Sequence, residues 1–151
     1  MAFTVTAGPS GSADGAALRA MQRRELDDRY GSDDHEPGAA PTDEDITVFL
    51  VARTADGQAV ACGALRQLDA SSAEIKRMFV LPASRGSGVA TAVLRGLEAE
   101  ARARGLGELK LETGTAQPEA MRFYEREGYG LIDNFGVYAG EPLSVCYARS
   151  L

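Results

Sequence analysis

The chain has 151 residues, a length that suits one domain able to bury a sizeable core. Its composition, 44% hydrophobic and 25% charged, is that of a globular protein, and its net charge of -6 argues against a nucleic-acid partner. The N-terminus lacks the pattern of a signal peptide, and no apolar run approaches the roughly 18 residues of a membrane span. We therefore expect a single cytoplasmic domain over residues 1–151, without a membrane partner.

The first half of the chain alternates apolar runs with turn residues. A short strand is expected at Phe3–Thr6, and a helix at Ala13–Arg29 with Ser12 as its N-cap. Two further strands, Ile46–Arg53 and Ala59–Leu68, flank an Asp-Gly pair. Because Asp-Gly favours tight hairpin turns, these strands are predicted to pair antiparallel.

The second half alternates strands and helices. In order, we expect a strand at Glu74–Val80, a helix at Val89–Arg104, a strand at Glu108–Glu112, a helix at Pro118–Glu127, and strands near Tyr129–Asp133 and Leu143–Arg149. The passage from strand through helix to strand implies a parallel pair with a right-handed crossover. The pattern predicts an α/β fold with a mixed sheet.

A glycine-bearing turn opens the helix that begins at Val89. The sequence there is Arg85-Gly86-Ser87-Gly88-Val89-Ala90. The first turn of a helix presents unpaired N–H groups and a partial positive charge, so it can hold a phosphate. The absence of a following Lys-Ser or Lys-Thr excludes a Walker loop, and the absence of a third glycine excludes the dinucleotide fingerprint.

This turn resembles the Arg/Gln-x-x-Gly-x-Gly/Ala motif of the GNAT (Gcn5-related) N-acetyltransferases, which hold the pyrophosphate of acetyl-CoA. The segment Gln117–Tyr129 is similar to the helix of that family that carries a Phe-Tyr pair, followed by a Gly-aromatic pair. The resemblance covers the chain well from Ile46 onward. It implies a mostly antiparallel sheet with a splayed parallel pair, and acetyl-CoA as co-substrate. No metal is expected, because Cys62, Cys146 and the lone His35 do not form any usual zinc pattern.

The resemblance also assigns the cofactor contacts. It implies that the pantetheine arm pairs with one splayed strand, that the glycine turn holds the diphosphate, and that Gln117 stands where many relatives have an asparagine. The implied set is Met78, Phe79, Val80, Arg85, Gly86, Ser87, Gly88, Val89, Ala90, Gln117 and Tyr124. A homodimer is an assembly that many family members form.

Two residues are expected to take part in the chemistry. By resemblance, Tyr124 lies near the sulfur of CoA and hydrogen-bonds or protonates the departing thiolate, and Glu74 lines up with a catalytic glutamate that accepts the proton of the amine. Glu112 and His35 are alternative bases. No reactive cysteine is indicated, because Cys62 and Cys146 lie in strand-like runs, so direct attack in a ternary complex is favoured over an acyl-enzyme.

The acceptor is the least determined part of the prediction. Six acidic residues gather between Gly31 and Asp45 without a Lys or Arg, which is typical of a solvated loop or of one that attracts a cationic amine. Basic residues on the first helix would instead pair with a substrate carboxylate. Candidate acceptor contacts are Arg23, Arg24, Tyr30, Phe135, Tyr138 and Ser144. A small primary amine is favoured, with a protein amine or a non-catalytic acyl-CoA sensor as alternatives.

Overall fold

The computed structural model describes residues 2–31 and 42–151. Seven strands form one sheet with the order β1-β2-β3-β4-β5-β7-β6. Their bounds are β1 Thr4–Ala7, β2 Val48–Arg53, β3 Ala59–Gln67, β4 Ser72–Val80, β5 Glu108–Gly114, β6 Gly130–Ile132 and β7 Ser144–Ser150. All pairs are antiparallel except β4 with β5. The prediction of a mixed, mostly antiparallel α/β sheet is confirmed.

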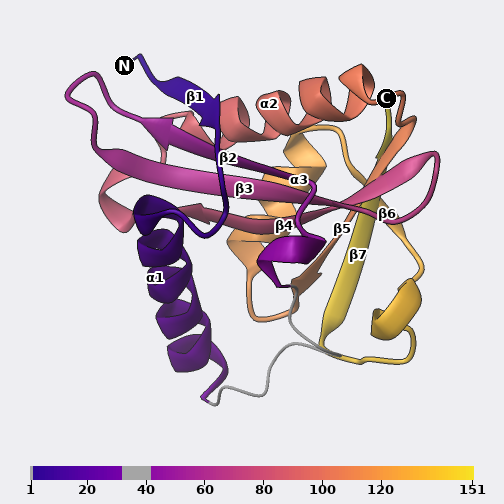
Figure 1. Ribbon diagram of the computed structural model, residues 1–151. Helices are drawn as coiled ribbons and strands as arrows, with labels where there is room; N and C mark the ends of the chain where they lie inside the picture. The colour runs from indigo at the N-terminus through magenta and orange to yellow at the C-terminus, as the bar shows by residue number, and fades with distance from the viewer. Residues whose placement is uncertain (1, 32–41) are drawn as a thin grey trace.

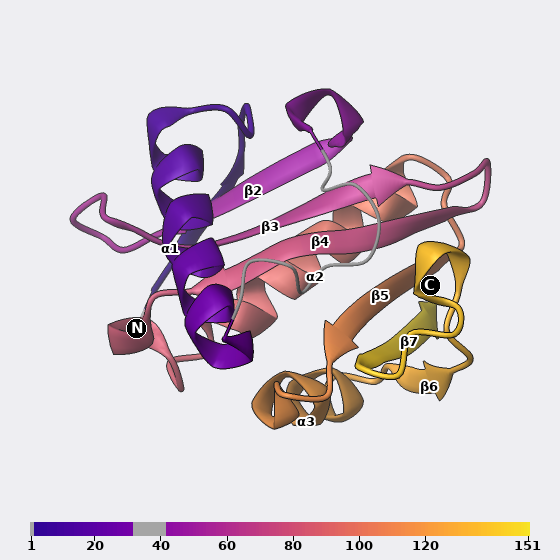
Figure 2. The ribbon, with the colours of Figure 1, turned by 90° about the horizontal axis from the view of Figure 1, so that it is seen from below.

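Three helices cover the two faces of the sheet (Figures 1 and 2). They are α1 Ala13–Tyr30, α2 Val89–Ala103 and α3 Pro118–Arg126. The Ser12 hydroxyl caps α1 by accepting from the Gly15 N–H at 3.2 Å, and Gly31 ends the helix at a φ of 74°. Short 3-10 turns at Asp43–Asp45 (η1), Pro82–Ser84 (η2) and Gly136–Tyr138 (η3) were not predicted.

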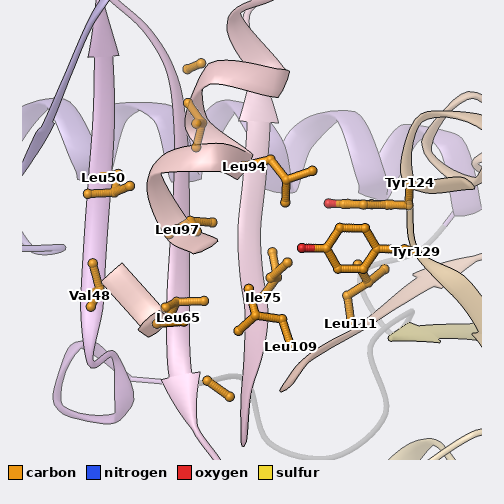
Figure 3. Close-up of a cluster of buried hydrophobic side chains, with 14 of the residues drawn as sticks. Val48, Leu50, Leu65, Ile75, Leu94, Leu97, Leu109, Leu111, Tyr124 and Tyr129 are labelled. Atoms are coloured by element: carbon orange, nitrogen blue, oxygen red, sulfur yellow. The ribbon is translucent and has the colours of Figure 1, made fainter. Parts of the chain in front are cut away.

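Two clusters of buried side chains lie on opposite faces of the sheet. The larger joins α2 and α3 to the sheet, and in it Tyr124 and Tyr129 lie beside Leu94, Ile75 and Leu111 (Figure 3). The smaller cluster packs α1 against β2, β3 and β4. Helix α1 therefore lies on one face of the sheet, and α2 and α3 lie on the other.

One buried carboxylate ties α2 to the C-terminal strands. The side chain of Glu98 is 1% exposed and accepts hydrogen bonds from Arg95 at 2.8 Å, Tyr129 at 2.8 Å and Arg149 at 2.9 Å. Burial pushes the pKa of Glu98 upward, but these hydrogen bonds and the charges of the two arginines outweigh it, so the pKa lies below its usual value. The folded state therefore favours the ionised carboxylate.

The parallel pair of strands comes apart part-way along its length. Residues Ser72 to Ile75 of β4 pair with Glu108 to Leu111 of β5, and no pair follows although both strands continue. The strands diverge beyond this point in Figure 2. An opening in the middle of the sheet results, as the family resemblance implied, and helices from both faces can reach it.

A bulge lies where β4 leaves its partner on the open side. The register with β3 shifts between Cys62 and Ala64, so that Gly63 faces both Arg77 and Met78. Arg77 has a φ of 57°, which is unusual for a residue with a side chain. A Cβ on Gly63 would lie 2.6 Å from the Sδ atom of Met78, so a glycine is required opposite the bulge.

The acidic segment Gly31–Asp45 lies mainly outside the described residues, as does the candidate base His35. Its end is more regular than expected, because Asp43–Asp45 forms the turn η1 with Thr42 as its cap. Among residues 2–31 and 42–151, no helix combines the length and the apolar character that crossing a membrane requires.

Candidate active site

The predicted phosphate turn has the geometry of an anion site. Gly86 and Gly88 have φ values of 79° and 88°, a region that residues with a Cβ rarely adopt. The first hydrogen bond of α2 runs from the Ala92 N–H to the Gly88 carbonyl, so the N–H groups before Ala92 point out of the helix end. A Cβ on either glycine would meet no atom of the described residues within 4 Å. The glycines are therefore needed for the backbone path, and open space lies beside them.

A cavity of about 590 Å³ extends from this turn into the opening of the sheet. We call it the donor cavity. It is lined by β4, by η2 and the start of α2, by α3, and by one side of α1. It brings together every predicted cofactor residue except Ser87, whose hydroxyl donates to the Ser84 carbonyl within the turn. Its size, its glycine turn and its strand wall fit the phosphates and the long arm of acetyl-CoA.

The open edge of β4 presents main-chain groups to this cavity. The Leu81 N–H donates to the Val60 carbonyl of β3 at 2.8 Å, so by alternation the groups of Val80 and Met78 point away from β3. Gln22 donates to the Met78 carbonyl at 3.0 Å, and Arg85 donates to the Val80 carbonyl at 3.1 Å. The side chains of Gln22 and Arg85 thus donate to the two carbonyls that would otherwise accept from an adjacent strand.

Arg85 is held by groups beyond the turn. Its guanidinium contacts Glu25 of α1 at 2.7 Å and lies 5.8 Å from the ring centroid of Phe79. Glu25 also lies 3.5 Å from Arg29, which in turn pairs with Glu119 of α3. A chain of alternating charges therefore links η2, α1 and α3 around the donor cavity, and it keeps the Arg85 cation at the cavity wall.

A second, smaller cavity of about 130 Å³ adjoins the first. We call it the acceptor cavity. Met78, Gln117 and Tyr124 line both cavities, together with Gln22, Leu26 and Ala120. The Tyr124 side chain is 6% exposed and packs edge-to-face on Phe123 and Tyr129. Burial raises the pKa of Tyr124, so the phenol keeps its proton.

Gln117 contacts the C-terminal end of α1. Its Nε2 atom donates to the Tyr30 hydroxyl at 3.3 Å, and Tyr30 lines the acceptor cavity. That hydroxyl would lie 1.6 Å from a Cβ on Gly114, so any larger residue at the end of β5 would displace the Tyr30 ring from this position. The absence of a side chain there lets α1 approach across the opening in the sheet.

Glu74 lies behind the wall of the acceptor cavity instead of at its entrance. Its side chain is fully buried and lines neither cavity. One carboxylate oxygen accepts from Arg66 at 2.8 Å, and the other accepts from the Tyr138 hydroxyl at 2.6 Å. The catalytic role of Glu74 stays a prediction, and the structure adds a second role, because this carboxylate also lies 3.6 Å from the Lys76 ammonium.

Glu112, one of the two alternative bases, lines the acceptor cavity directly. Its carboxylate accepts a hydrogen bond from the Ser144 hydroxyl at 2.7 Å. Tyr30 also lines this cavity, whereas Arg23, Arg24, Phe135, Tyr138 and Ser144 do not. Neither Ser144 nor Tyr138 lines the cavity, but the Ser144 hydroxyl donates a hydrogen bond to Glu112 and the Tyr138 hydroxyl donates one to Glu74.

Several wall residues were missed by the sequence reasoning. Arg19, Gln22 and Leu26 were not assigned to the site, although they recur at helical spacing along α1 with the predicted contact Tyr30 and form one stripe that faces the cavity. Lys76 of β4 also lines this cavity. The helical spacing shows from the sequence that these residues share one face of α1. Which face of α1 lines the cavity depends on where the sheet opens, and the sequence does not show that.

The two cysteines lie in the sheet and are buried. Burial raises the pKa of the Cys62 thiol to about 12, and it also raises the pKa of Cys146. Because the thiolate is the nucleophilic form, neither residue is suited to carry an acetyl group.

Known proteins share this fold and these motifs. The model of the Acetyltransferase (GNAT) family matches residues 17–129. An IAA acetyltransferase of Azospirillum brasilense is 40% identical over 104 residues, which are 68% of this chain and 67% of the relative. A Klebsiella pneumoniae structure assigned as an acyl-CoA N-acyltransferase is 32% identical with a TM-score of 0.82, covering 99% of this chain and 97% of the other. A GNAT acetyltransferase of Elizabethkingia anophelis with acetyl-CoA bound shares the fold at 16% identity and a TM-score of 0.71, covering 99% and 98%.

The chain therefore belongs to the GNAT family of acetyltransferases. It is an acetyl-CoA-dependent N-acetyltransferase. The family uses acetyl-CoA, and the donor cavity contains the two motifs that the sequence assigned to that co-substrate.

Proposed function

We propose that the enzyme transfers the acetyl group of acetyl-CoA to the primary amine of a small molecule by direct attack within a ternary complex. The observation that carries this proposal is the meeting of two cavities at Tyr124, Gln117 and Met78. The larger cavity suits the donor, and the smaller suits a compact acceptor. An IAA acetyltransferase among the relatives also favours a small-molecule acceptor.

In this proposal the chain itself supplies three contributions. The main chain of β4 binds the arm of acetyl-CoA along its open edge, and the N–H of Val80, which points away from β3, is placed to stabilise the developing oxyanion. Tyr124 donates a hydrogen bond to the departing thiolate. A phenol with a raised pKa is a weaker acid than a thiol of pKa about 8.5, so Tyr124 stabilises the thiolate without surrendering its proton.

The amine must lose a proton before or during its attack, because a protonated amine has no lone pair. Glu112 is the carboxylate on the wall of the acceptor cavity, and Glu74 is the buried carboxylate behind it. We propose that one of them takes the proton, Glu112 directly or Glu74 through an intervening group. Direct attack is supported over an acyl-enzyme by the burial and raised pKa of both thiols.

The test is thiol release from acetyl-CoA across a panel of primary amines, corrected for hydrolysis. We expect acceptor-dependent release with at least one small amine, and no acetylated enzyme by intact mass after acetyl-CoA alone. Binding of acetyl-CoA without release from any acceptor would favour a sensor module. A stable acetylated enzyme would contradict direct attack.

A further inference from the structure

Three basic side chains lie close together on the described wall of the acceptor cavity. Arg19, Lys76 and Arg77 line it, with Glu112 as the carboxylate among the described lining residues. The side chains of Lys76 and Arg77 are only 10% and 9% exposed. Keeping such cations away from water is costly unless anionic or polar groups compensate them.

Lys76 is fixed in place by groups that lie outside the cavity. Its ammonium contacts the Tyr138 hydroxyl at 3.0 Å and lies 3.6 Å from the Glu74 carboxylate. Glu74 is in turn bound by Arg66 and by Tyr138. The buried carboxylate thus fixes the position of the Lys76 ammonium, and an ammonium with three donors can also serve a ligand.

The two arginines approach the cavity from different elements. Arg19 comes from α1 and contacts Gln22 at 3.0 Å, whereas Arg77 comes from the bulge of β4 and contacts Asp43 at 3.2 Å. Both line the acceptor cavity. A guanidinium binds carboxylates and phosphonates through paired N–H donors.

We propose that the acceptor is a small amine that also carries an anionic group, a carboxylate or a phosphonate, which Lys76, Arg19 and Arg77 bind. This proposal rests on the proposed transfer to a small amine and names its substrate class. The anion lies at the cationic wall, and the amine lies toward Tyr124 and Met78, where the cavities meet. Because Lys76 precedes Met78 by two residues of one strand, the two ends of such a substrate are separated by a short chain.

The experiment compares matched acceptors that differ only in the anion. Glycine, β-alanine and 4-aminobutanoate form the carboxylate arm, 2-aminoethylphosphonate forms the phosphonate arm, and ethylamine, propylamine and butylamine are neutral controls. We expect a kcat/KM at least about tenfold higher for the best anionic acceptor than for its neutral match, as loss of a charged hydrogen bond predicts. The series of acceptors with the higher kcat/KM, carboxylate or phosphonate, identifies the anionic group that the site binds.

Variants test whether the named cations carry this preference. Arg19→Gln and Lys76→Gln should each reduce the preference about tenfold or more, mainly through KM, and Lys76→Arg should retain part of it. Arg104→Gln makes the same exchange on the far end of α2, where Arg104 pairs with Glu100, and should change nothing. Binding of the same acceptors is also measured by calorimetry in the presence of CoA, which requires no turnover.

The outcomes separate this inference from the proposed function. Equal kcat/KM for anionic and neutral acceptors overturns the inference and leaves the transfer reaction intact. Anion-dependent binding that Lys76→Gln abolishes, without transfer to any amine, supports the inference while the proposed function fails. If no anionic acceptor binds or reacts better than its neutral match, the cationic wall has no role in acceptor recognition.

Discussion

The Tyr124→Phe substitution removes one hydroxyl at the junction of the donor and acceptor cavities. A thiolate leaving group is negatively charged, so the hydrogen bond that the phenol donates to it is worth about 1.5–3 kcal/mol. That energy corresponds to a roughly 10- to 150-fold decrease in kcat, with little change in the affinity for acetyl-CoA. Because burial raises the pKa of Tyr124, the decrease should be the same across the ordinary pH range of the assay.

Tyr129→Phe is the matched control, since the two rings pack edge-to-face with centroids 5.8 Å apart. The Tyr129 hydroxyl donates to buried Glu98 at 2.8 Å, so its loss should lower the free energy of unfolding by about 1.5–3 kcal/mol while kcat stays unchanged. Tyr124→Phe should leave stability within about 0.5 kcal/mol. Steady-state kinetics measure kcat, and urea unfolding measures the free energy of unfolding, for both variants. A Tyr124→Phe enzyme with wild-type kcat, or a Tyr129→Phe enzyme equally impaired in turnover, would refute the assignment.

Three further changes test other parts of the site. Gly88→Val forces a β-branched residue to a φ of 88°, at a cost of about 1–2 kcal/mol, and should weaken acetyl-CoA binding by calorimetry. Gly31→Val, at a φ of 74° and also without neighbours within 4 Å among the described residues, is its control and should leave binding unchanged. If Glu112 is the base, Glu112→Gln should flatten the alkaline rise of the rate in a pH–rate profile, whereas Glu74→Gln should mainly raise KM. The reverse pattern would make Glu74 the base. Glu98 has a lowered pKa in the folded state, so it stabilises the fold above its ordinary pKa of 4.5 and this contribution is lost as the pH falls below that value. Glu98→Gln should therefore be less stable than wild type in urea at pH 7 by about 1–3 kcal/mol, with a gap that narrows in acid; a gap independent of pH would contradict this.

Most of the fold could be predicted because its signals are local. Apolar periodicity located the three α-helices and seven strands of the described residues within two residues or so, and the Asp-Gly turn between β2 and β3 has the expected positive φ at Gly57. The bulge at Arg77 gave no such signal. Its left-handed backbone belongs to a residue type that rarely adopts it, so it reflects the pairing with Gly63 instead of a local preference.

The two sides of the site differed in how well the sequence predicted them. The donor side consists of contiguous motifs, and its residues meet in one cavity. The acceptor side is assembled from α1, β4 and β5, so its composition depends on tertiary packing. The environment of Glu74 illustrates the difference, because its partner Tyr138 lies 64 positions further along the chain. Sequence reasoning could name the carboxylate but could not place it behind Lys76.

The early end of the pairing between β4 and β5 also has a consequence for folding. Beyond Ile75 the sheet has an edge in its interior, and the carbonyls of Met78 and Val80 are bonded there by the side chains of Gln22 and Arg85. A ligand that adds backbone-like bonds along this edge completes the sheet, so its binding energy adds to the free energy of unfolding. The amide hydrogens of Met78 and Val80 should therefore exchange with solvent quickly in the free enzyme and slowly once CoA is bound. In the proposed binding mode, the co-substrate pairs with β4 as a removable eighth strand.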